Sequence, residues 1–194
     1  MKDEITVSLE QKIFDVKKVW SDPNCFALKD LSVIVEKFVS TISAGKKVAF
    51  VGNGGSAAES IHLAAEFTGK CVIEHRPLPV LCLNESQSAI TAIANDYGFD
   101  QIFARQVKAH LQEGDLLIAL STSGKSKNIL EALKVASKME VSCMLWMGNF
   151  DANIPSVSIF KAPSTLTPRI QEIHLAWGHI IAEVIERHID LVST

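Results

Sequence analysis

The chain has 194 residues, of which 47% are hydrophobic and 21% charged, and its formal net charge is −3 at pH 7. A chain of this length buries roughly 70% of its unfolded surface, so it can fold as one domain without disulfide bonds or a structural metal ion. The charge gives no electrostatic reason to expect nucleic acid, and no run reaches the ~20 apolar residues of a membrane span. We therefore expect one cytoplasmic domain over residues 1–194, with its four scattered cysteines reduced.

The N-terminal part of the chain is predicted to be helical. Residues 4–20 and 27–44 carry apolar side chains at helical spacing. Residues 21–24, with the sequence Ser-Asp-Pro-Asn, have the composition of a turn. The sequence therefore predicts an N-terminal helical hairpin over residues 1–44, followed by an α/β core over residues 45–194.

Strand-like and helix-like runs alternate from Lys46 onward. The predicted strands cover residues 47–51, 79–83, 115–120, 141–146 and 157–160. The predicted helices cover residues 56–67, 86–95, 101–111, 126–138 and 168–188. This alternation favours the α/β class, with a five-stranded parallel sheet flanked by helices in three layers.

Two polar loops, each placed between an apolar strand-like run and a helix, give the clearest functional signal. The first is Gly-Asn-Gly-Gly-Ser at residues 52–56, and the second is Ser-Thr-Ser-Gly-Lys-Ser at residues 121–126. Glycines let the backbone approach a ligand, hydroxyl and N–H groups supply donors, and a helix N-terminus adds positive potential. Together the loops predict a small phosphorylated molecule bound at the rim of the sheet.

The first loop also fits two other interpretations. Its glycine spacing satisfies a loose dinucleotide fingerprint, with Glu74 about twenty residues further on. Ser56 and Glu59 have the spacing of a capping box, in which Ser56 simply begins the helix. Capping and phosphate binding are compatible, because both use the unpaired N–H groups of a helix start.

Candidate metal ligands and acid–base groups lie on two predicted helices. His62 and Glu66 are four residues apart, so both project from one helix face, as suits two ligands of one metal or an acid and a base. Gln171 and His179 are eight residues apart, a rise of about 12 Å on a straight helix. The latter two can hardly bind one metal from the same copy of the helix. If both serve one kind of site, we expect them to come from different subunits.

The last helix is predicted to be buried on two faces. Its main apolar stripe consists of Ile170, Ile173, Trp177, Ile181 and Val184. A second side, which includes Gly178 and Ala182, is small and apolar, and packing against another subunit would explain it. His174 falls nearer the main stripe, where we expect a hydrogen-bonded structural histidine.

Five segments in chain order carry a family resemblance. They are VGNGGS at 51–56, HLAAEFTG at 62–69, ANDYGF at 94–99, STSGKS at 121–126 and RIQEIH at 169–174. Over nearly its whole length the sequence resembles the sugar isomerase (SIS) domain family, and within it the bacterial phosphoheptose isomerases. The resemblance implies an aldose–ketose isomerase that converts sedoheptulose 7-phosphate to D-glycero-D-manno-heptose 7-phosphate through an ene-diol(ate). This reaction serves heptose biosynthesis for surface polysaccharide, that is, lipopolysaccharide or capsule.

The resemblance also implies a set of site residues, carried over position by position. One zinc ion per active site would be held by His62, Glu66, Gln171 and His179. Glu66 would be the catalytic base and His179 the catalytic acid. The substrate phosphate would lie on Ser121, Thr122, Ser123 and Ser126. The rest of the substrate would contact Asn53, Gly54, Gly55, Ser56, Glu66, Asn95, Asp96 and Gln171. The family's homotetramers, with active sites at subunit interfaces, agree with the helix-spacing argument.

Three positions depart from the family pattern. Lys70 stands where arginine is common, and Pro168 stands where an aspartate usually precedes the Arg-Ile-Gln run. Residues 147–151 lack the usual glycine-rich, lysine-bearing sequence. These departures leave open an isomerase for a different sugar phosphate. A non-catalytic SIS-domain protein that binds a sugar phosphate or the replication initiator is a further alternative, against which the retained ligand set speaks.

Overall fold

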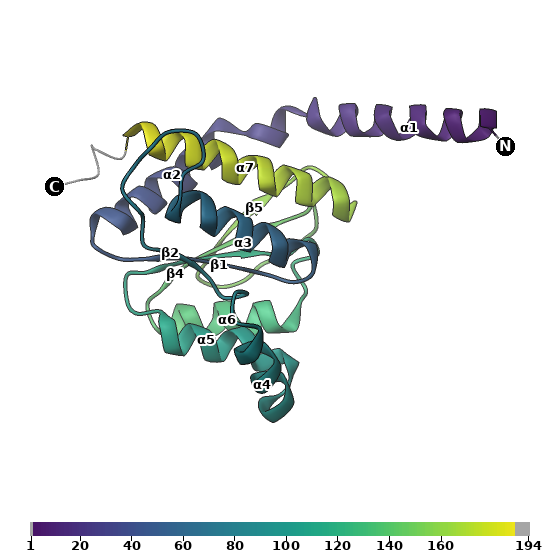
Figure 1. The fold of residues 1–194 in the computed structure, drawn as a ribbon. Coiled ribbons are helices and arrows are strands. Elements are labelled where there is room, and N and C mark those ends of the chain that lie inside the picture. The colour runs from purple at the N-terminus through teal and green to yellow at the C-terminus, as the bar shows by residue number, and fades with distance from the viewer. Residues whose placement is uncertain (1, 189–194) are drawn as a thin grey trace.

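Five apolar runs pair as a β-sheet in the computed structural model, which describes residues 2–188 (Figure 1). The strands are β1 Val48–Gly52, β2 Val80–Cys82, β3 Leu116–Leu120, β4 Ser142–Met147 and β5 Val157–Lys161. Their order is β2-β1-β3-β4-β5, and every neighbouring pair is parallel. β1 and β3 are buried along their whole length, which explains their continuous apolar sequences. The predicted α/β class and five-stranded parallel sheet are confirmed.

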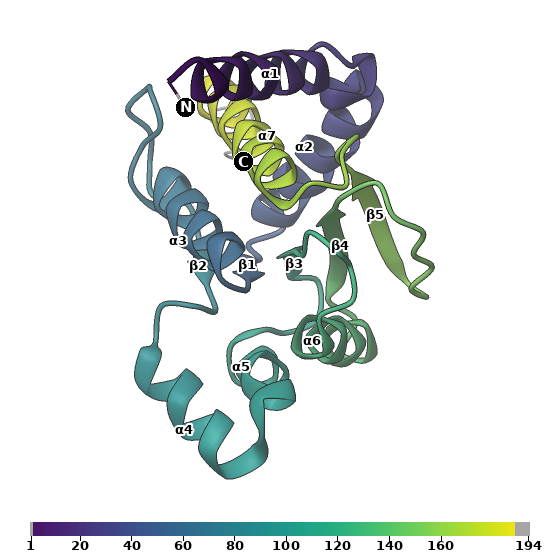
Figure 2. The ribbon, with the colours of Figure 1, turned by 90° about the vertical axis from the view of Figure 1, so that its right-hand side faces the viewer.

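Helices cover both faces of the sheet (Figures 1 and 2). One face carries α2 Leu28–Ser43, α3 Gly55–Thr68 and α7 Thr167–His188; the other carries α5 Ile102–His110 and α6 Lys127–Lys138, with α4 Gln87–Tyr97 beyond α5. Short 3-10 turns, η1 Pro23–Phe26 and η2 Phe99–Gln101, precede α2 and α5. Each face has its own core, one around Phe67 and Trp146 and the other around Phe103 and Leu133. The predicted elements end within two residues of the observed bounds.

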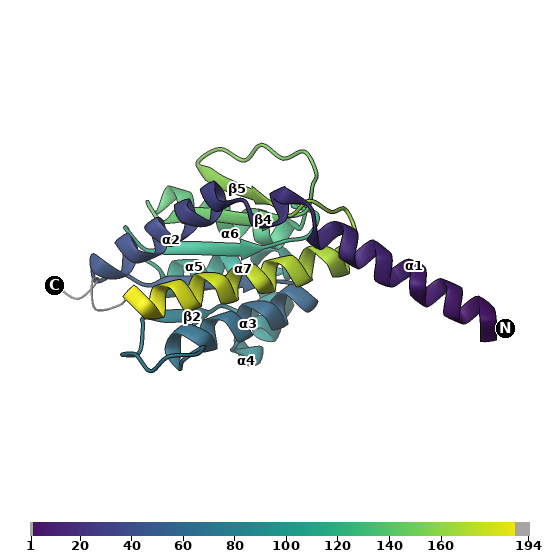
Figure 3. The same cartoon turned by 90° about the horizontal axis from the view of Figure 1, so that it is seen from above.

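The N-terminal helix α1, Lys2–Trp20, extends away from the domain as an arm (Figures 1 and 3). Both N-terminal helices are present as predicted, but α1 does not fold back along α2 as a hairpin would. At the turn, the Asp22 carboxylate accepts a hydrogen bond from the Asn24 N–H and caps η1, which leads into α2. The arm leaves Ile5, Leu9 and Phe14 more than half exposed.

The helices α3 and α7 pack closely because a glycine lies at their contact. A Cβ atom at Gly178 would collide with the side chain of Leu63, which is fully buried. Gly178 and Ala182 are buried, so the second apolar face of α7 is covered within the same chain. The expectation that another subunit is needed to cover this face is therefore wrong. Val184, placed in the main stripe by sequence, is 37% exposed, and Ile185 is buried instead.

Two further expectations concern the whole chain. Among residues 2–188, no helix combines the length and the apolar character that crossing a bilayer requires. All four cysteines are free thiols, and Cys25, Cys82 and Cys143 are buried.

We predict that Gly178→Ala destabilises the protein by about 1–3 kcal/mol, because the added methyl group overpacks the contact with Leu63. The helix propensity of alanine acts in the opposite direction by about 1 kcal/mol. Urea unfolding measures the difference. The same substitution made in a Leu63→Ala background should cost much less, since the colliding branches are gone. A more stable Gly178→Ala protein would contradict the close packing of α3 and α7.

Candidate active site

The two polar loops meet at the carboxyl edge of the sheet. β1 lies between β2 and β3, so the connections that follow β1 and β3 leave in opposite directions at this point of the strand order. The register pairs Gly52 with Leu120, which starts the two loops side by side. Such a switch point is where open parallel sheets bind ligands. The predicted location of a small-molecule site at the rim is consistent with this geometry.

The first loop is shaped by its glycines and held by Asn84. Gly54 has φ 56°, and a Cβ atom at Gly52 would collide with the Ser56 carbonyl, so both positions favour glycine. The Asn84 amide donates to the Gly52 carbonyl at 2.9 Å, and the Gly52 N–H donates to the Asn84 side-chain oxygen at 3.1 Å. Sequence reasoning missed Asn84, whose position just after the short strand β2 was its only local signal.

Both alternative interpretations of the first loop disagree with the structure. The N-cap of α3 is Gly54, without a side-chain cap, so Ser56 already lies inside the helix and does not form a capping box. Glu74 precedes β2, whereas the ribose-binding acid of a dinucleotide fold follows the second strand. Its carboxylate pairs with Lys70 on an exposed loop. Glu74 is therefore not placed to bind the ribose of a dinucleotide, which speaks against this interpretation.

The second loop joins β3 to α6 and brings its hydroxyl groups together. The Oγ atoms of Ser121 and Ser126 lie 3.4 Å apart, and the Lys125 N–H donates to the Ser123 Oγ. The Gly148 N–H donates to the Thr122 carbonyl at 2.9 Å, which ties this loop to the end of β4. The predicted phosphate residues therefore form one compact turn at the start of a helix, an arrangement suited to an anion.

A pair of asparagines connects the two loops. The Asn53 and Asn128 side chains exchange amide hydrogen bonds of 2.8 and 2.9 Å, and Asn128 is buried at the start of α6. This pairing leaves little freedom for the first loop to move relative to the second.

Three of the four predicted metal ligands come together between α3 and α7. His62 Nε2 lies 2.9 Å from His179 Nε2 and 3.1 Å from the Glu66 carboxylate. One ligand atom from each residue can be chosen so that all lie within 4.8 Å of one another. Two imidazoles and a carboxylate are a donor set that zinc accepts in catalytic sites, with a fourth position left for another ligand. The residues thus fit a zinc ion, and they come from one copy of the chain.

Gln171 lies at the first loop rather than in this cluster. Its amide donates to the Ser56 Oγ at 3.4 Å, and a Cβ atom at Gly55 would collide with the same amide. A helix rise of about 12 Å separates it from His179, as its spacing predicts. The structure therefore places Gln171 beside the predicted sugar-contacting residues of its own chain.

Asn95 and Asp96 lie apart from the other predicted site residues. Both are exposed on α4, which is on the opposite side of the sheet from α3 and α7, and the Asn95 amide donates to the Asp96 carboxylate. No residue of α4 is buried. Their predicted contact with the sugar is not formed by the arrangement of this single chain.

Glu59 is a buried carboxyl group beside the site that the sequence reasoning considered only as a cap. It is 9% exposed, and one of its oxygens has no partner among the described residues. Burial raises the pKa of Glu59 to about 7. The sequence could have indicated that Glu59 belongs to the site, because its helical spacing puts it on the same face of α3 as Gly55, His62 and Glu66.

His174 is a structural histidine, as predicted. It is fully buried between Trp146 and Trp177, and its Nε2 lies 3.4 Å from the Met147 carbonyl. Burial lowers the pKa of His174 to about 4, so the ring is neutral near pH 7. It does not belong to the acid–base set.

Two of the three departures from the family pattern, Lys70 and Pro168, are accommodated by their local surroundings. Lys70 is exposed and pairs with Glu74 at 3.3 Å. Pro168 lies in the first turn of α7, where the missing N–H has no helical acceptor to lose. In the segment 147–151, a Cβ atom at Gly148 would collide with Ile170.

The parallel sheet and the loop pair at its switch point define an SIS-type sugar-phosphate fold, and comparison with known proteins agrees. A model of the SIS domain matches residues 27–144. The phosphoheptose isomerase of Clostridium acetobutylicum is 37% identical over 191 residues, covering 97% of this chain and 96% of that protein. That of Rhodospirillum rubrum is 46% identical over 149 residues, covering 76% and 79%.

A solved structure is also similar. The phosphoheptose isomerase from Neisseria gonorrhoeae matches with a TM-score of 0.85 at 30% identity, covering 93% of this chain and 99% of that one. The chain belongs to the SIS-domain phosphoheptose isomerase family, and it is an isomerase.

We predict that Glu59→Gln stabilises the protein more at pH 8 than at pH 5. The unfolded chain ionises this carboxyl above about pH 4.5, but the folded protein ionises it only above about pH 7. Stability is therefore lost as the pH rises through that window, and the neutral amide avoids the loss. At the higher pH, the Tm should rise by about 2–4 °C for each kcal/mol by which the substitution increases the free energy of unfolding. Equal shifts at both pH values would contradict a raised pKa.

Proposed function

We propose that the protein is a zinc-dependent isomerase that converts sedoheptulose 7-phosphate to D-glycero-D-manno-heptose 7-phosphate. The observation that carries this proposal is the His62, Glu66 and His179 cluster, which lies between the two helices that flank the first loop. Relatives named phosphoheptose isomerase across most of the chain support the choice of substrate. The product would enter heptose biosynthesis for surface polysaccharide in the cytoplasm.

The reaction moves a proton between adjacent carbons. A base removes a proton from C1 of the ketose, an ene-diol(ate) forms, and a proton is returned at C2 while the carbonyl moves to C1. We assign Glu66 as the base and His179 as the acid that serves the oxygens. Glu66 is mostly buried in its side chain, at 17% exposure, which limits competition from water.

The zinc would be held by His62, Glu66 and His179, with Gln171 as the fourth predicted ligand. Bound zinc supplies polarisation of the carbonyl and hydroxyl oxygens. Coordination and proton transfer compete for the same lone pairs, so Glu66 does not do both through one oxygen at one time. Since Gln171 lies at the first loop of its own chain, a Gln171 ligand would come from another subunit.

The substrate would span the sheet edge. Its phosphate would rest on Ser121, Thr122, Ser123 and Ser126, whose turn begins α6. The sugar chain would follow the first loop, Asn53, Gly54, Gly55 and Ser56, toward the cluster. Asn95 and Asp96, on the far side of the sheet in one chain, would reach it only from a neighbouring subunit or after α4 moves.

We further propose a homotetramer with active sites at subunit interfaces. The support is the arm α1, on which Ile5, Leu9 and Ile13 recur every four residues and are each more than half exposed. An apolar stripe of this kind is stable when a second copy covers it.

A different sugar phosphate is the second candidate substrate. Lys70 favours it, because a lysine replaces the planar, bidentate donor that arginine would offer to a phosphate or carboxylate. Pro168 favours it as well, since a ring replaces a carboxylate next to the start of α7.

We predict that Glu66→Gln and His179→Gln each lower turnover of sedoheptulose 7-phosphate by about 10²- to 10⁴-fold, because each removes a proton-transfer group. The assay adds zinc to the purified protein and measures the aldose product. In deuterium oxide the wild-type product should carry deuterium at C2.

Glu85→Gln, which removes an exposed carboxylate elsewhere, is the matched control and should retain activity. Turnover that survives both substitutions would contradict the catalytic assignment. No turnover by the wild type, with turnover of a related sugar phosphate, would favour the second substrate. No turnover of any sugar phosphate would favour the non-catalytic alternative.

We predict that Leu9→Glu with Ile13→Glu dissociates the tetramer, since each buried apolar anchor contributes about 2 kcal/mol or more to such an interface. Light scattering measures the molar mass, and circular dichroism checks that the fold is kept. Ser8→Glu, which puts the same charge on the polar side of α1, should stay tetrameric. A dissociated protein with full activity would contradict active sites built at interfaces.

A further inference from the structure

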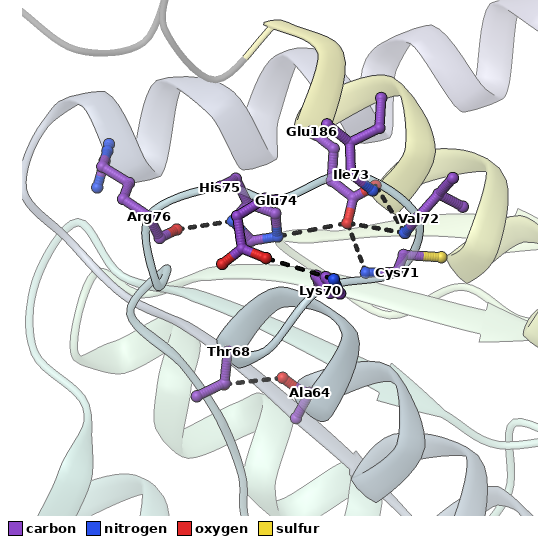
Figure 4. A network of polar contacts seen from close by, with 10 residues as sticks. All are labelled: Ala64, Thr68, Lys70, Cys71, Val72, Ile73, Glu74, His75, Arg76 and Glu186. Atoms are coloured by element: carbon purple, nitrogen blue, oxygen red, sulfur yellow. Dashed lines mark hydrogen bonds and ion pairs between the residues drawn. The ribbon is translucent and has the colours of Figure 1, made fainter.

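The connection between α3 and β2 is fastened to α7 by one carboxylate. The Glu186 carboxylate accepts N–H hydrogen bonds from three successive residues: Cys71 at 2.5 Å, Val72 at 3.0 Å and Ile73 at 3.0 Å (Figure 4). The same carboxylate lies 3.4 Å from Nε2 of His75, and the side chains of His75 and Glu186 are only 1% and 2% exposed. The connection thus wraps around a buried group that comes from a distant part of the sequence.

The Glu186 carboxyl group is ionised in this setting, because both of its oxygens act as acceptors. Burial by itself raises the pKa of a carboxyl group, but the N–H groups of Ile73, Cys71 and Val72, together with His75, outweigh it and keep the pKa of Glu186 below its usual value. Hydrogen bonds to a charged acceptor are about twice as strong as neutral ones. A buried negative charge therefore lies next to the His75 ring.

The His75 ring has an acceptor beside each of its two nitrogens (Figure 4). Its Nδ1 lies 2.7 Å from the Arg76 carbonyl oxygen, which can only accept, so Nδ1 carries a proton. Its Nε2 lies beside the Glu186 carboxylate and has no hydrogen-bond partner among the described residues. In a neutral ring, Nε2 would hold a lone pair next to a negative charge, whereas a second proton turns this repulsion into an attraction. The surroundings of both nitrogens therefore favour the imidazolium form.

No other charged group takes the place of Glu186 as the partner of His75. The titratable and charged side chains on the neighbouring segments are those of Glu36 and Lys37 on α2, Glu66 on α3, Lys70, Cys71, Glu74 and Arg76 on the connection, and Glu183, Arg187 and His188 on α7. In the part of the chain that the structure describes, none of these side chains pairs with His75 or Glu186; Lys70 and Glu74 pair with each other and are more than half exposed. Exposed charges of this kind are screened by water and contribute little.

We propose that His75 is a cation that pairs with Glu186, and that Glu186, His75 and the N–H groups of residues 71–73 form a protonation-dependent latch. While the ring holds both protons, the buried carboxylate has a counter-ion and stays in place to accept the three N–H groups. When the ring loses its Nε2 proton, the carboxylate is left as an uncompensated buried charge, and the connection loosens. The latch is closed between the acid range in which Glu186 gains a proton and the pH at which His75 loses one, and it opens as the pH rises further. It does not depend on the reaction proposed above.

The charge of the ring can be measured directly by nitrogen NMR of the labelled full-length protein. Both ring nitrogens of His75 should carry protons at about pH 6. In Glu186→Gln the ring should be neutral at the same pH, because burial disfavours a cation that has no counter-charge. Glu183→Gln removes a charge from the same helix and is the matched control, in which the ring should remain as in the wild type. A bare Nε2 in the wild type, or an imidazolium that persists in Glu186→Gln, would overturn the pairing.

The latch itself is tested by hydrogen exchange of the 71–73 amides, expressed at each pH as protection relative to the unfolded chain. Protection should fall at least about tenfold as the His75 ring loses its proton. His75→Gln has no proton to lose in this range, so its protection should lie below the wild-type value at about pH 6 and stay constant. His188→Gln removes an exposed histidine from α7 and is the matched control, which should keep the wild-type response.

Two results of the exchange experiment would overturn the latch. Protection that stays constant while His75 titrates would show that the charge of the ring does not hold the connection. A pH response that survives in His75→Gln would show that another group controls it. If Glu186→Gln fails to fold, His75→Gln decides between these outcomes, since it keeps the carboxylate and the three N–H groups that the carboxylate binds.

Discussion

The close packing of α3 against α7 is the constraint on which the site depends. His62 and His179 are 117 residues apart in sequence, yet their Nε2 atoms lie 2.9 Å apart. Imidazole side chains are short, so they meet only when the two helix axes are near the close end of the usual 8–10 Å range. Gly178 permits this approach, because a side chain there would occupy the volume of Leu63. The candidate metal-ligand cluster is thus brought together by a packing contact one residue away from each histidine.

The loops at the sheet edge are organised by a different kind of interaction. Asn84 bonds both backbone groups of Gly52, and the Asn53–Asn128 pair joins the two loops. Asn84 satisfies the two backbone groups at the end of β1, whereas the Asn53 and Asn128 side chains satisfy each other. The result is a ligand-facing surface whose donors are held in place before anything binds, which lowers the entropy lost on binding. Rigid loops and closely packed helices therefore meet at one edge of the sheet.

Local periodicity was sufficient to predict most of the fold. Strands such as β3 and helices such as α6 can be predicted from the hydrophobic pattern of about ten residues. The proximity of His62 and Glu66 follows from helical spacing alone. Features that depend on distant contacts could not be found this way. Two examples are the direction of α1 relative to α2, and the packing of α3 against the second face of α7.

The supporting polar residues were missed for the same reason. Asn84 and Glu186 have no distinctive neighbours in sequence, and their roles exist only where remote backbone groups reach them. Glu59 had a helical-spacing signal, but its burial, which sets its pKa, depends on the packing around it.

The pairing of α3 with α7 also shows how one helix contacts the first loop, the candidate metal cluster and the segment that follows α3. Gln171 meets Ser56, His179 meets His62, and Glu186 meets Cys71, and these pairs are separated by 115, 117 and 115 residues. A nearly constant offset means that the two helices run parallel, with both N-termini at the ligand-binding edge (Figure 1). Their positive ends then converge where a phosphorylated substrate would lie. The same offset makes the site sensitive to register, because a shift of α7 by one residue turns its side chains by about 100°. Such a shift would remove all three contacts at once. The buried stripe of α7, which fixes the register of this helix against the sheet, is therefore as important to the candidate site as the site residues that α7 carries.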